Sequence, residues 1–134
     1  MTYLIDSDWV IDHLEEVPDA NRLLDTLAGD GIAISMITYM EVFQGVERSP
    51  SRSDALVKLR AFLAAVPVLP VSFPVAERCA RLRETLKAQR KRVNSRALDL
   101  INAATALEHN LTFVTRNIDD YKDIPGLKLH RPGP

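Results

Sequence analysis

The chain has too few cysteines for internal cross-linking and too few apolar runs for a membrane span. Cys79 is the single cysteine, so no disulfide can form within the chain, and its amphipathic surroundings predict a buried thiol in a reducing compartment. No apolar run approaches the roughly 18 residues that a membrane helix needs, and no basic leader with an apolar core and cleavage site is visible. We therefore expect a soluble, cytoplasmic protein without membrane association.

Several catalytic motifs are also missing. The sequence contains no phosphate-binding glycine loop, no nucleophile elbow and no Cys/His pair. Its histidines, His13, His109 and His130, lack the spacing of zinc ligands. Nucleotide-driven, acyl-transfer, thiol and zinc chemistries are therefore unsupported.

The chain has the size and composition of one compact domain, spanning residues 1–134. It has 134 residues and is 46% hydrophobic, enough to bury about two-thirds of the unfolded-chain surface. We find no internal repeat, low-complexity tract or interdomain linker.

Short apolar runs alternate with helical patterns along the chain. We predict strands at 2–6, 32–35, 66–71, 111–115 and 127–129, and helices from about residue 7, at 19–28, from 38, at 54–65, from 72 and at 96–109. The proline-bounded run at 66–71 suits a sheet edge, and the tail from 131 is expected to fray. This alternation predicts an α/β fold with a mostly parallel central sheet covered by helices on both faces.

Acidic and amide side chains follow the predicted strands or stand early in helices. Asp6 ends the first strand, Glu41 and Asp99 lie near helix starts, and Asn117 and Asp120 follow the strand at 111–115. In open parallel sheets, ligands bind outside the carboxyl ends of the strands at a topological switch point. We expect these residues to meet there.

Helix capping offers an alternative explanation for most of these residues. Asp6 and Asn117 suit N-cap positions, and the segment from Thr38 to Glu41 has the form of a capping box. Asp99 differs because it lies in an apolar helix, where an unpaired carboxylate is costly. Capping explains each residue separately but does not explain why four acid-bearing elements should converge.

Oxygen ligands alone indicate a hard cation, Mg²⁺ or Mn²⁺. Asp8 is a further candidate around such a site. The hydroxyls of Ser7, Thr38 and Thr115 either hold ligands and waters by hydrogen bonds or serve as caps and strand-end residues.

Charge is distributed unevenly along the sequence. Residues 1–30 carry eight acids and the single base Arg22, whereas residues 78–96 carry eight bases and the single acid Glu84. A solvated helix face is one explanation of the basic run; the other is phosphate binding beside the acidic site. The candidates for contact with a phosphate backbone are Arg83, Lys87, Arg90, Lys91, Arg92, Arg96 and Arg116.

Four segments together resemble the successive motifs of PIN-domain ribonucleases. They are Leu4 to Asp8, Ile34 to Gly45, Asp99 to Ala106 and Val114 to Tyr121. Their order, spacing and total length are similar to those of VapC-like toxins from bacterial and archaeal toxin–antitoxin systems. The resemblance covers almost the whole chain.

The resemblance implies a Mg²⁺- or Mn²⁺-dependent endoribonuclease with a three-layer α/β/α fold, usually a homodimer, inhibited by a cognate antitoxin. By motif position, Asp6, Glu41 and Asp99 are its metal ligands. The fourth position carries Asn117, which offers an oxygen but no charge, and Asp120 is the alternative there.

RNA and an antitoxin would then bind different parts of the chain. We expect the RNA to be single-stranded or looped; for Tyr39 and Tyr121, beside motif acids, packing is favoured over base stacking. The helices within 8–28 and 54–65 offer a groove for an amphipathic antitoxin segment.

Two other functions stay open. Asp6-Ser7-Asp8 after a strand also resembles the nucleophile motif of haloacid-dehalogenase-type phosphatases, although the Thr and Gly expected after the acid pair are missing. The other alternative is a catalytically silent PIN-like module that binds RNA or protein.

Overall fold

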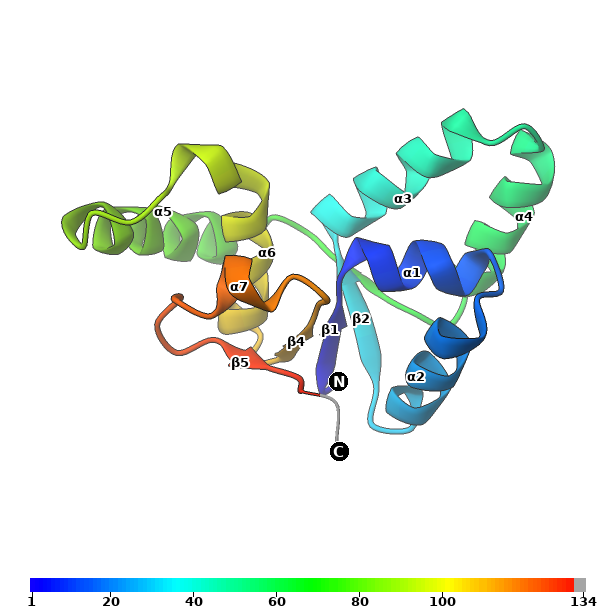
Figure 1. Cartoon of the computed structure of the whole chain (residues 1–134), viewed down its shortest axis with the longest axis horizontal. Coiled ribbons are helices and arrows are strands. Elements are labelled where there is room, and N and C mark those ends of the chain that lie inside the picture. The colour runs from blue at the N-terminus through cyan, green and yellow to red at the C-terminus, as the bar shows by residue number, and fades with distance from the viewer. Residues whose placement is uncertain (132–134) are drawn as a thin grey trace.

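The protein, described for residues 1–131 by a computed structural model, is built around a five-stranded sheet (Figure 1). The strands are β1 (Tyr3–Ile5), β2 (Ile32–Ser35), β3 (Val68–Leu69), β4 (Thr112–Val114) and β5 (Lys128–Leu129). They lie in the order β3-β2-β1-β4-β5, and every neighbouring pair is parallel. The prediction of an α/β fold with a mostly parallel sheet is confirmed.

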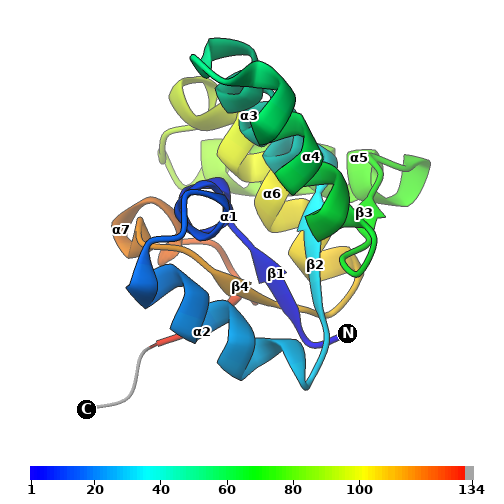
Figure 2. The ribbon, with the colours of Figure 1, turned by 90° about the vertical axis from the view of Figure 1, so that its right-hand side faces the viewer.

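Helices cover both faces of this sheet, because successive side chains of a strand point to opposite faces. The helices are α1 (Ser7–Leu14), α2 (Pro18–Ala28), α3 (Met36–Arg48), α4 (Arg52–Leu63), α5 (Phe73–Ala88), α6 (Ala97–Glu108) and the short α7 (Ile118–Tyr121). Leu4 and Phe113 pack toward α5 and α6, whereas Ile5 and Val114 pack with α1 to α4. The result is the three-layer arrangement seen from two sides in Figures 1 and 2.

Most predicted elements are present, with shifted boundaries. The strand predicted at 66–71 is limited to two residues, Val68–Leu69, because prolines flank it on both sides and cannot donate to a ladder. Pro18 begins α2 rather than only interrupting the preceding helix, since a proline is tolerated in a first helical turn. The predicted frayed tail lies almost wholly outside the described residues.

Three helices end with non-glycine residues in the left-handed region of φ. Glu16, Arg90 and Asn110 have φ values of 63°, 60° and 54°. Each follows a helix, and the next amide closes a 6→1 hydrogen bond, as from Lys91 N–H to the Leu86 carbonyl at 2.9 Å. These residues end α1, α5 and α6, and only the one after α6 leads directly into a strand, β4.

Among the residues that the structure describes, no helix has both the length and the apolar character needed to cross a bilayer.

Candidate active site

Asp6 lies at the centre of the candidate site, directly beyond the carboxyl end of β1. After β1 the chain adds β2 and β3 on one side of it and then β4 and β5 on its other side. The carboxyl end of β1 is therefore the topological switch point of the sheet. The side chain is 5% exposed. One carboxylate oxygen accepts the Ser7 amide at 2.8 Å and the other accepts the Thr115 hydroxyl at 2.6 Å. Asp6 therefore caps α1, as the alternative explanation proposed, and its second oxygen is held from β4.

Glu41 and Asp99 approach Asp6 from two other helices. Glu41 lies in the second turn of α3, close enough to the Ser7 side chain for that group to lower the pKa of the Glu41 carboxyl. Asp99 lies in the first turn of α6, and one of its oxygens accepts the Tyr121 hydroxyl at 3.0 Å. The structure thus brings together the three acids that the sequence placed in different motifs.

Burial and like charge act on these acids together. The pKa of Asp6 is raised chiefly by burial, against the hydrogen bonds from Thr115 and Ser7, and also by the charges of Asp8 and Asp99. Burial likewise raises the pKa of Glu41, and the charges of Asp6, Asp99 and Asp8 add to the effect. The site therefore concentrates negative charge that its own hydrogen bonds do not fully stabilise.

The donor set suits a hard cation, although the ligands are not gathered into a closed shell. Within residues 1–131, no three acidic, histidine or cysteine side chains are arranged closely enough to hold a metal ion as they stand. Carboxylates and hydroxyls, here Asp6, Glu41, Asp99 and Ser7, are nevertheless the oxygen ligands that Mg²⁺ and Mn²⁺ accept. A divalent cation would also relieve the repulsion among the acids.

The predicted capping box at Thr38 is wrong. Helix α3 starts earlier, at Met36, and Ser35 is its N-cap, whose hydroxyl accepts the Thr38 amide at 3.0 Å. Glu41 is consequently one full turn inside the helix and faces Ser7 instead of a cap. The Thr38 hydroxyl is buried and finds no hydrogen-bond partner among the described residues.

The two candidates for the fourth motif position lie at the edge of the site. Asn117 is exposed at the N-cap position of α7, and its backbone N–H donates to the Thr115 hydroxyl at 3.0 Å. Asp120 pairs with Arg92 at 3.5 Å and is not among the charges that raise the pKa of Asp6 or Glu41. Asn117 is therefore linked to Asp6 through Thr115, and Asp120 is directed toward the basic segment.

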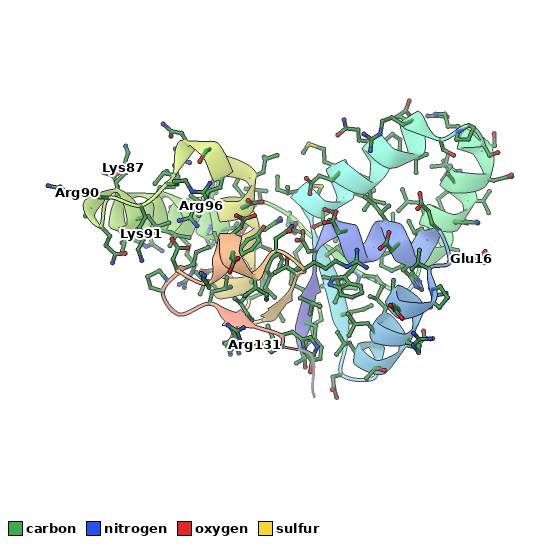
Figure 3. All side chains as sticks on the ribbon, viewed as in Figure 1. Glu16, Lys87, Arg90, Lys91, Arg96 and Arg131 are labelled. Atoms are coloured by element: carbon green, nitrogen blue, oxygen red, sulfur yellow. The ribbon has the colours of Figure 1, made fainter. Side chains whose placement is uncertain are left out.

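Most of the predicted RNA-binding side chains are at least partly exposed near the end of α5. Lys87, Arg90 and Lys91 extend from its outer end (Figure 3), and Arg83 donates to Asn94 at 3.1 Å.

Arg96 does not belong with them, and this differs from the sequence prediction. It is 5% exposed, and its guanidinium forms two 2.8 Å bonds with Asp123 and one of 2.9 Å to the Asp120 carbonyl. Buried arginines require such partners, and the ion pair fixes the loop before α6 rather than contacting a ligand.

Arg116 is held at the rim by partners that sequence reasoning missed. Its guanidinium lies 3.9 Å from the centre of the Trp9 ring and 2.7 Å from the Asp12 carboxylate. Trp9 and Asp12 are three residues apart in α1 and hence on one face. This anchoring reduces the freedom of Arg116 while leaving its side chain 37% exposed.

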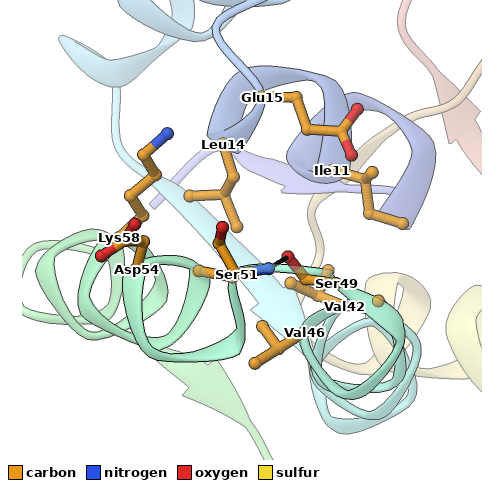
Figure 4. Close-up of a pocket in the computed structure, with 11 residues that line it drawn as sticks. Ile11, Leu14, Glu15, Val42, Val46, Ser49, Ser51, Asp54 and Lys58 are labelled. Atoms are coloured by element: carbon orange, nitrogen blue, oxygen red, sulfur yellow. Dashed lines mark hydrogen bonds between the residues drawn. The ribbon is translucent and has the colours of Figure 1, made fainter.

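Two hollows border α1 and α4, away from the acids. One, of about 310 Å³, has Ile11, Leu14, Val42 and Val46 among its lining, with Glu15, Asp54 and Lys58 at its edge (Figure 4). The second, of about 490 Å³, lies among α1, α2 and α4 and includes His13, Asn21 and Phe62. The second corresponds to the groove predicted from residues 8–28 and 54–65, and the first adds α3 to it.

Ser35, Asn102 and Tyr121 are further polar residues beside the acids, and the sequence did not single out the first two. All three are buried. In the sequence, Asn102 is an amide within the apolar run of α6, a pattern that could have indicated a buried polar role. No sequence pattern marks Ser35 in this way. For Tyr121, the packing favoured over base stacking is confirmed.

Several known proteins are similar to this chain. A family model described as "PIN domain" matches residues 3–127. "Ribonuclease VapC2" of Rickettsia felis is 30% identical over 131 residues, which cover 96% of each protein.

Two solved structures extend the similarity. The crystal structure of VapBC2 from Rickettsia felis bound to a DNA fragment from their promoter contains a chain that is 27% identical, with a TM-score of 0.84 and coverage of 99% of this chain and 100% of that one. A toxin–antitoxin complex from Klebsiella pneumoniae gives 30% identity, a TM-score of 0.74 and coverage of 94% and 95%.

Proposed function

The chain belongs to the PIN-domain family, and we propose on that premise that it is a divalent-cation-dependent endoribonuclease and the toxin of a toxin–antitoxin pair. One observation carries the proposal: at the switch point of a parallel sheet, the buried Asp6 lies close enough to Asp99, and Glu41 close enough to both, for the charges of these neighbours to raise the pKa of Asp6 and of Glu41. The ribonuclease name of the relative and the toxin–antitoxin complex support the same function. The single domain expected over residues 1–134 forms part of the proposal.

Asp6, Glu41 and Asp99 would hold Mg²⁺ or Mn²⁺ through oxygen atoms. Such a cation supplies the Lewis acidity and positive charge needed to activate water and stabilise a phosphodiester under attack. The protein's own contribution is positional: Thr115 and Ser7 hold Asp6, and Ser7 also orients Glu41. Asp8 adds negative charge around them, and Thr38 offers a hydroxyl that lacks another partner among residues 1–131.

RNA would reach these acids along the basic side of the molecule. Arg116, anchored on Trp9 and Asp12, is positioned to contact a phosphate at the rim. Arg83, Lys87, Arg90, Lys91 and Arg92 supply further backbone contacts, with Asn117 and Asp120 between them and the acids. Arg96 supports this segment from within.

An antitoxin segment would occupy the groove beside α1 and α4. Its floor of Ile11, Leu14, Val42 and Val46 suits the apolar face of a helix, and the charged edge suits its polar flank. A basic side chain reaching from that partner toward Asp6 and Glu41 would inhibit by replacing the cation. A second copy of the chain is also expected, and exposed apolar side chains such as Met40 and Phe73 offer contact surface.

The PIN-domain match argues against the alternative of a haloacid-dehalogenase-type phosphatase. A silent module that binds RNA without cleaving it is the remaining competitor, and it is distinguished from the nuclease by catalysis alone.

Growth of bacteria that express the chain tests this function. We expect the wild type to arrest growth and to cut cellular RNA, Asp99→Asn to be tolerated, and the exposed control Asp30→Asn to stay toxic. Equal tolerance of all three proteins at matched expression, with intact RNA, would contradict the proposal.

A further inference from the structure

A chain of buried polar groups leads from the start of α3 to Asp99. Ser35 follows Ile34 at the end of β2, Asn102 lies in α6 and Tyr121 in α7, and these side chains are 1%, 2% and 1% exposed. Buried polar groups are normally hydrogen-bonded. Here Ser35 is bonded to Asn102 and Tyr121 is bonded to Asp99, so the polar groups lead toward the Asp99 carboxylate.

The donors and acceptors can be assigned step by step. The Thr38 amide donates to the Ser35 hydroxyl at 3.0 Å, and that hydroxyl donates to the Asn102 amide oxygen at 2.5 Å. The Asn102 side chain also lies close enough to the Tyr121 hydroxyl to lower the pKa of that hydroxyl. The Tyr121 hydroxyl donates to Asp99 Oδ1 at 3.0 Å. Because an ionised carboxylate only accepts hydrogen bonds, the sequence of donors ends there.

Packing fixes the members of this chain. Asp99 and Asn102 are three residues apart on α6 and therefore share a face. The Tyr121 ring packs against Phe113 with 4.7 Å between centroids. A tyrosine hydroxyl is protonated at neutral pH and can therefore donate a hydrogen bond.

We propose that Tyr121 is a positioning residue for Asp99. By binding Oδ1 it orients the carboxylate so that Oδ2 faces the cation held with Asp6 and Glu41. Asn102 and Ser35 align Tyr121 in turn and connect it to α3, the helix that carries Glu41. This inference rests on the proposed function, since it assigns a role in the same cation site.

A purely structural Tyr121 would behave differently from a positioning one. Tyr121→Phe keeps the ring in its contact with Phe113 and removes only the hydroxyl. If Tyr121 merely fills the core, the change would alter stability and leave cation binding intact. If it positions Asp99, cation affinity falls even in a folded variant, as is usual when a group that orients a metal ligand is lost.

The test is Mn²⁺ binding by the metal-free full-length chain, followed by electron paramagnetic resonance of the free ion. We expect the dissociation constant to rise about tenfold in Tyr121→Phe and to stay unchanged in the control Tyr3→Phe, whose ring contacts His130 at the other end of the sheet. RNA cleavage by Tyr121→Phe should recover as the Mn²⁺ concentration is raised.

A second variant keeps the test decisive if Tyr121→Phe fails to fold. Asn102→Leu should weaken Mn²⁺ binding in the same direction, and the double variant should lose no more than the larger single loss, because the hydrogen-bond chain is already broken. Wild-type affinity in folded Tyr121→Phe and in folded Asn102→Leu would overturn the positioning role alone. Absence of Mn²⁺ binding by the wild type would overturn the cation site together with it.

Discussion

At the scale of single residues, acids that the proposed function needs lower the stability of the folded protein. Asp6 and Glu41 are acids whose pKa values are raised by burial and by neighbouring negative charge. The hydrogen bonds that Asp6 accepts from Ser7 and Thr115 favour its charged form, but burial and neighbouring negative charge outweigh them and weaken the metal-free protein. On the proposed function, their charge would serve to bind a cation.

Glu41→Gln should stabilise the metal-free protein at neutral pH. Because the pKa of Glu41 is higher in the folded state than in the unfolded state, the folded protein loses stability as pH rises through the ordinary glutamate pKa to the raised value. We expect the variant to exceed the wild type by about 0.5–1 kcal/mol at pH 7.

Urea unfolding with EDTA at pH 7 and at pH 4 provides the measurement. The difference between the two proteins should nearly vanish at pH 4, where the unfolded glutamate is itself largely protonated. A variant less stable than the wild type at pH 7 would show that Glu41 supports the fold and is not strained by it.

At the scale of elements, three helices end at a residue that has a left-handed backbone but is not glycine. Glu16 follows α1 with φ 63° and lies at the opposite end of the molecule from Lys87 and Arg90 (Figure 3). A side chain in this region costs about 1 kcal/mol that glycine would not.

Glu16→Gly should therefore raise the free energy of unfolding by about 1 kcal/mol. Glu15→Gly is the matched control, since Glu15 has φ −88° and gains nothing from glycine; we expect it to lose roughly 0.5–1 kcal/mol. Thermal melting of both variants measures these changes in stability. A loss of stability in both variants would contradict the assignment of a left-handed backbone at Glu16.

The loop before α6 depends on the ion pair of Arg96 with Asp123. Removing one partner of such a pair leaves the other charge unpaired, so Arg96→Met should cost on the order of 2–3 kcal/mol, reduced because the Asp123 side chain keeps 28% exposure. Arg92→Met, which loses only an exposed pair with Asp120, should stay within about 0.5 kcal/mol of the wild type. Equal urea midpoints for the two variants would show that Arg96 is not structural.

Sequence patterns predicted the elements well because hydrophobic periodicity determines them locally. They did not predict where α3 begins, since Ser35 and Thr38 are both acceptable caps and the choice depends on Asn102, 67 residues away from Ser35. The burial of Arg96 was equally hidden, because its partner Asp123 is distant in sequence and charge alone does not distinguish an exposed arginine from a paired one. Long-range polar pairing was the information that the sequence lacked.

At the scale of the whole molecule, acidic and basic surfaces lie on different elements. The acids of residues 1–30 surround α1 and α2, and the basic side chains extend from the end of α5. On the proposed function, this division would let one protein hold a cation at one place and attract a polyanion at another. Exposed basic residues act on such a ligand mainly through the release of its counterions.

Lys87→Gln combined with Lys91→Gln should weaken RNA binding most at low salt. If both lysines contact phosphates, the slope of log affinity against log salt should become shallower by about 1.4, or 0.7 for each contact with a single strand. Lys58→Gln, in the groove between α1 and α4, serves as the control and should leave the slope unchanged. An unchanged slope in the double variant would mean that RNA approaches by another face.

Metal-dependent RNA cleavage by the purified chain tests the central claim most directly. A pool of single-stranded and structured RNA would be incubated with Mg²⁺, Mn²⁺ or EDTA and the wild type, Asp6→Asn, Asp99→Asn or the control Asp30→Asn, each shown to be folded, and the cut ends would be mapped. We predict cleavage by the wild type and by Asp30→Asn that EDTA abolishes, and a loss of at least about a hundredfold in Asp6→Asn and Asp99→Asn, by analogy with the loss of other groups that stabilise transition-state charge. Cleavage that survives in both site variants, or RNA binding without any cleavage by the wild type, would contradict the account.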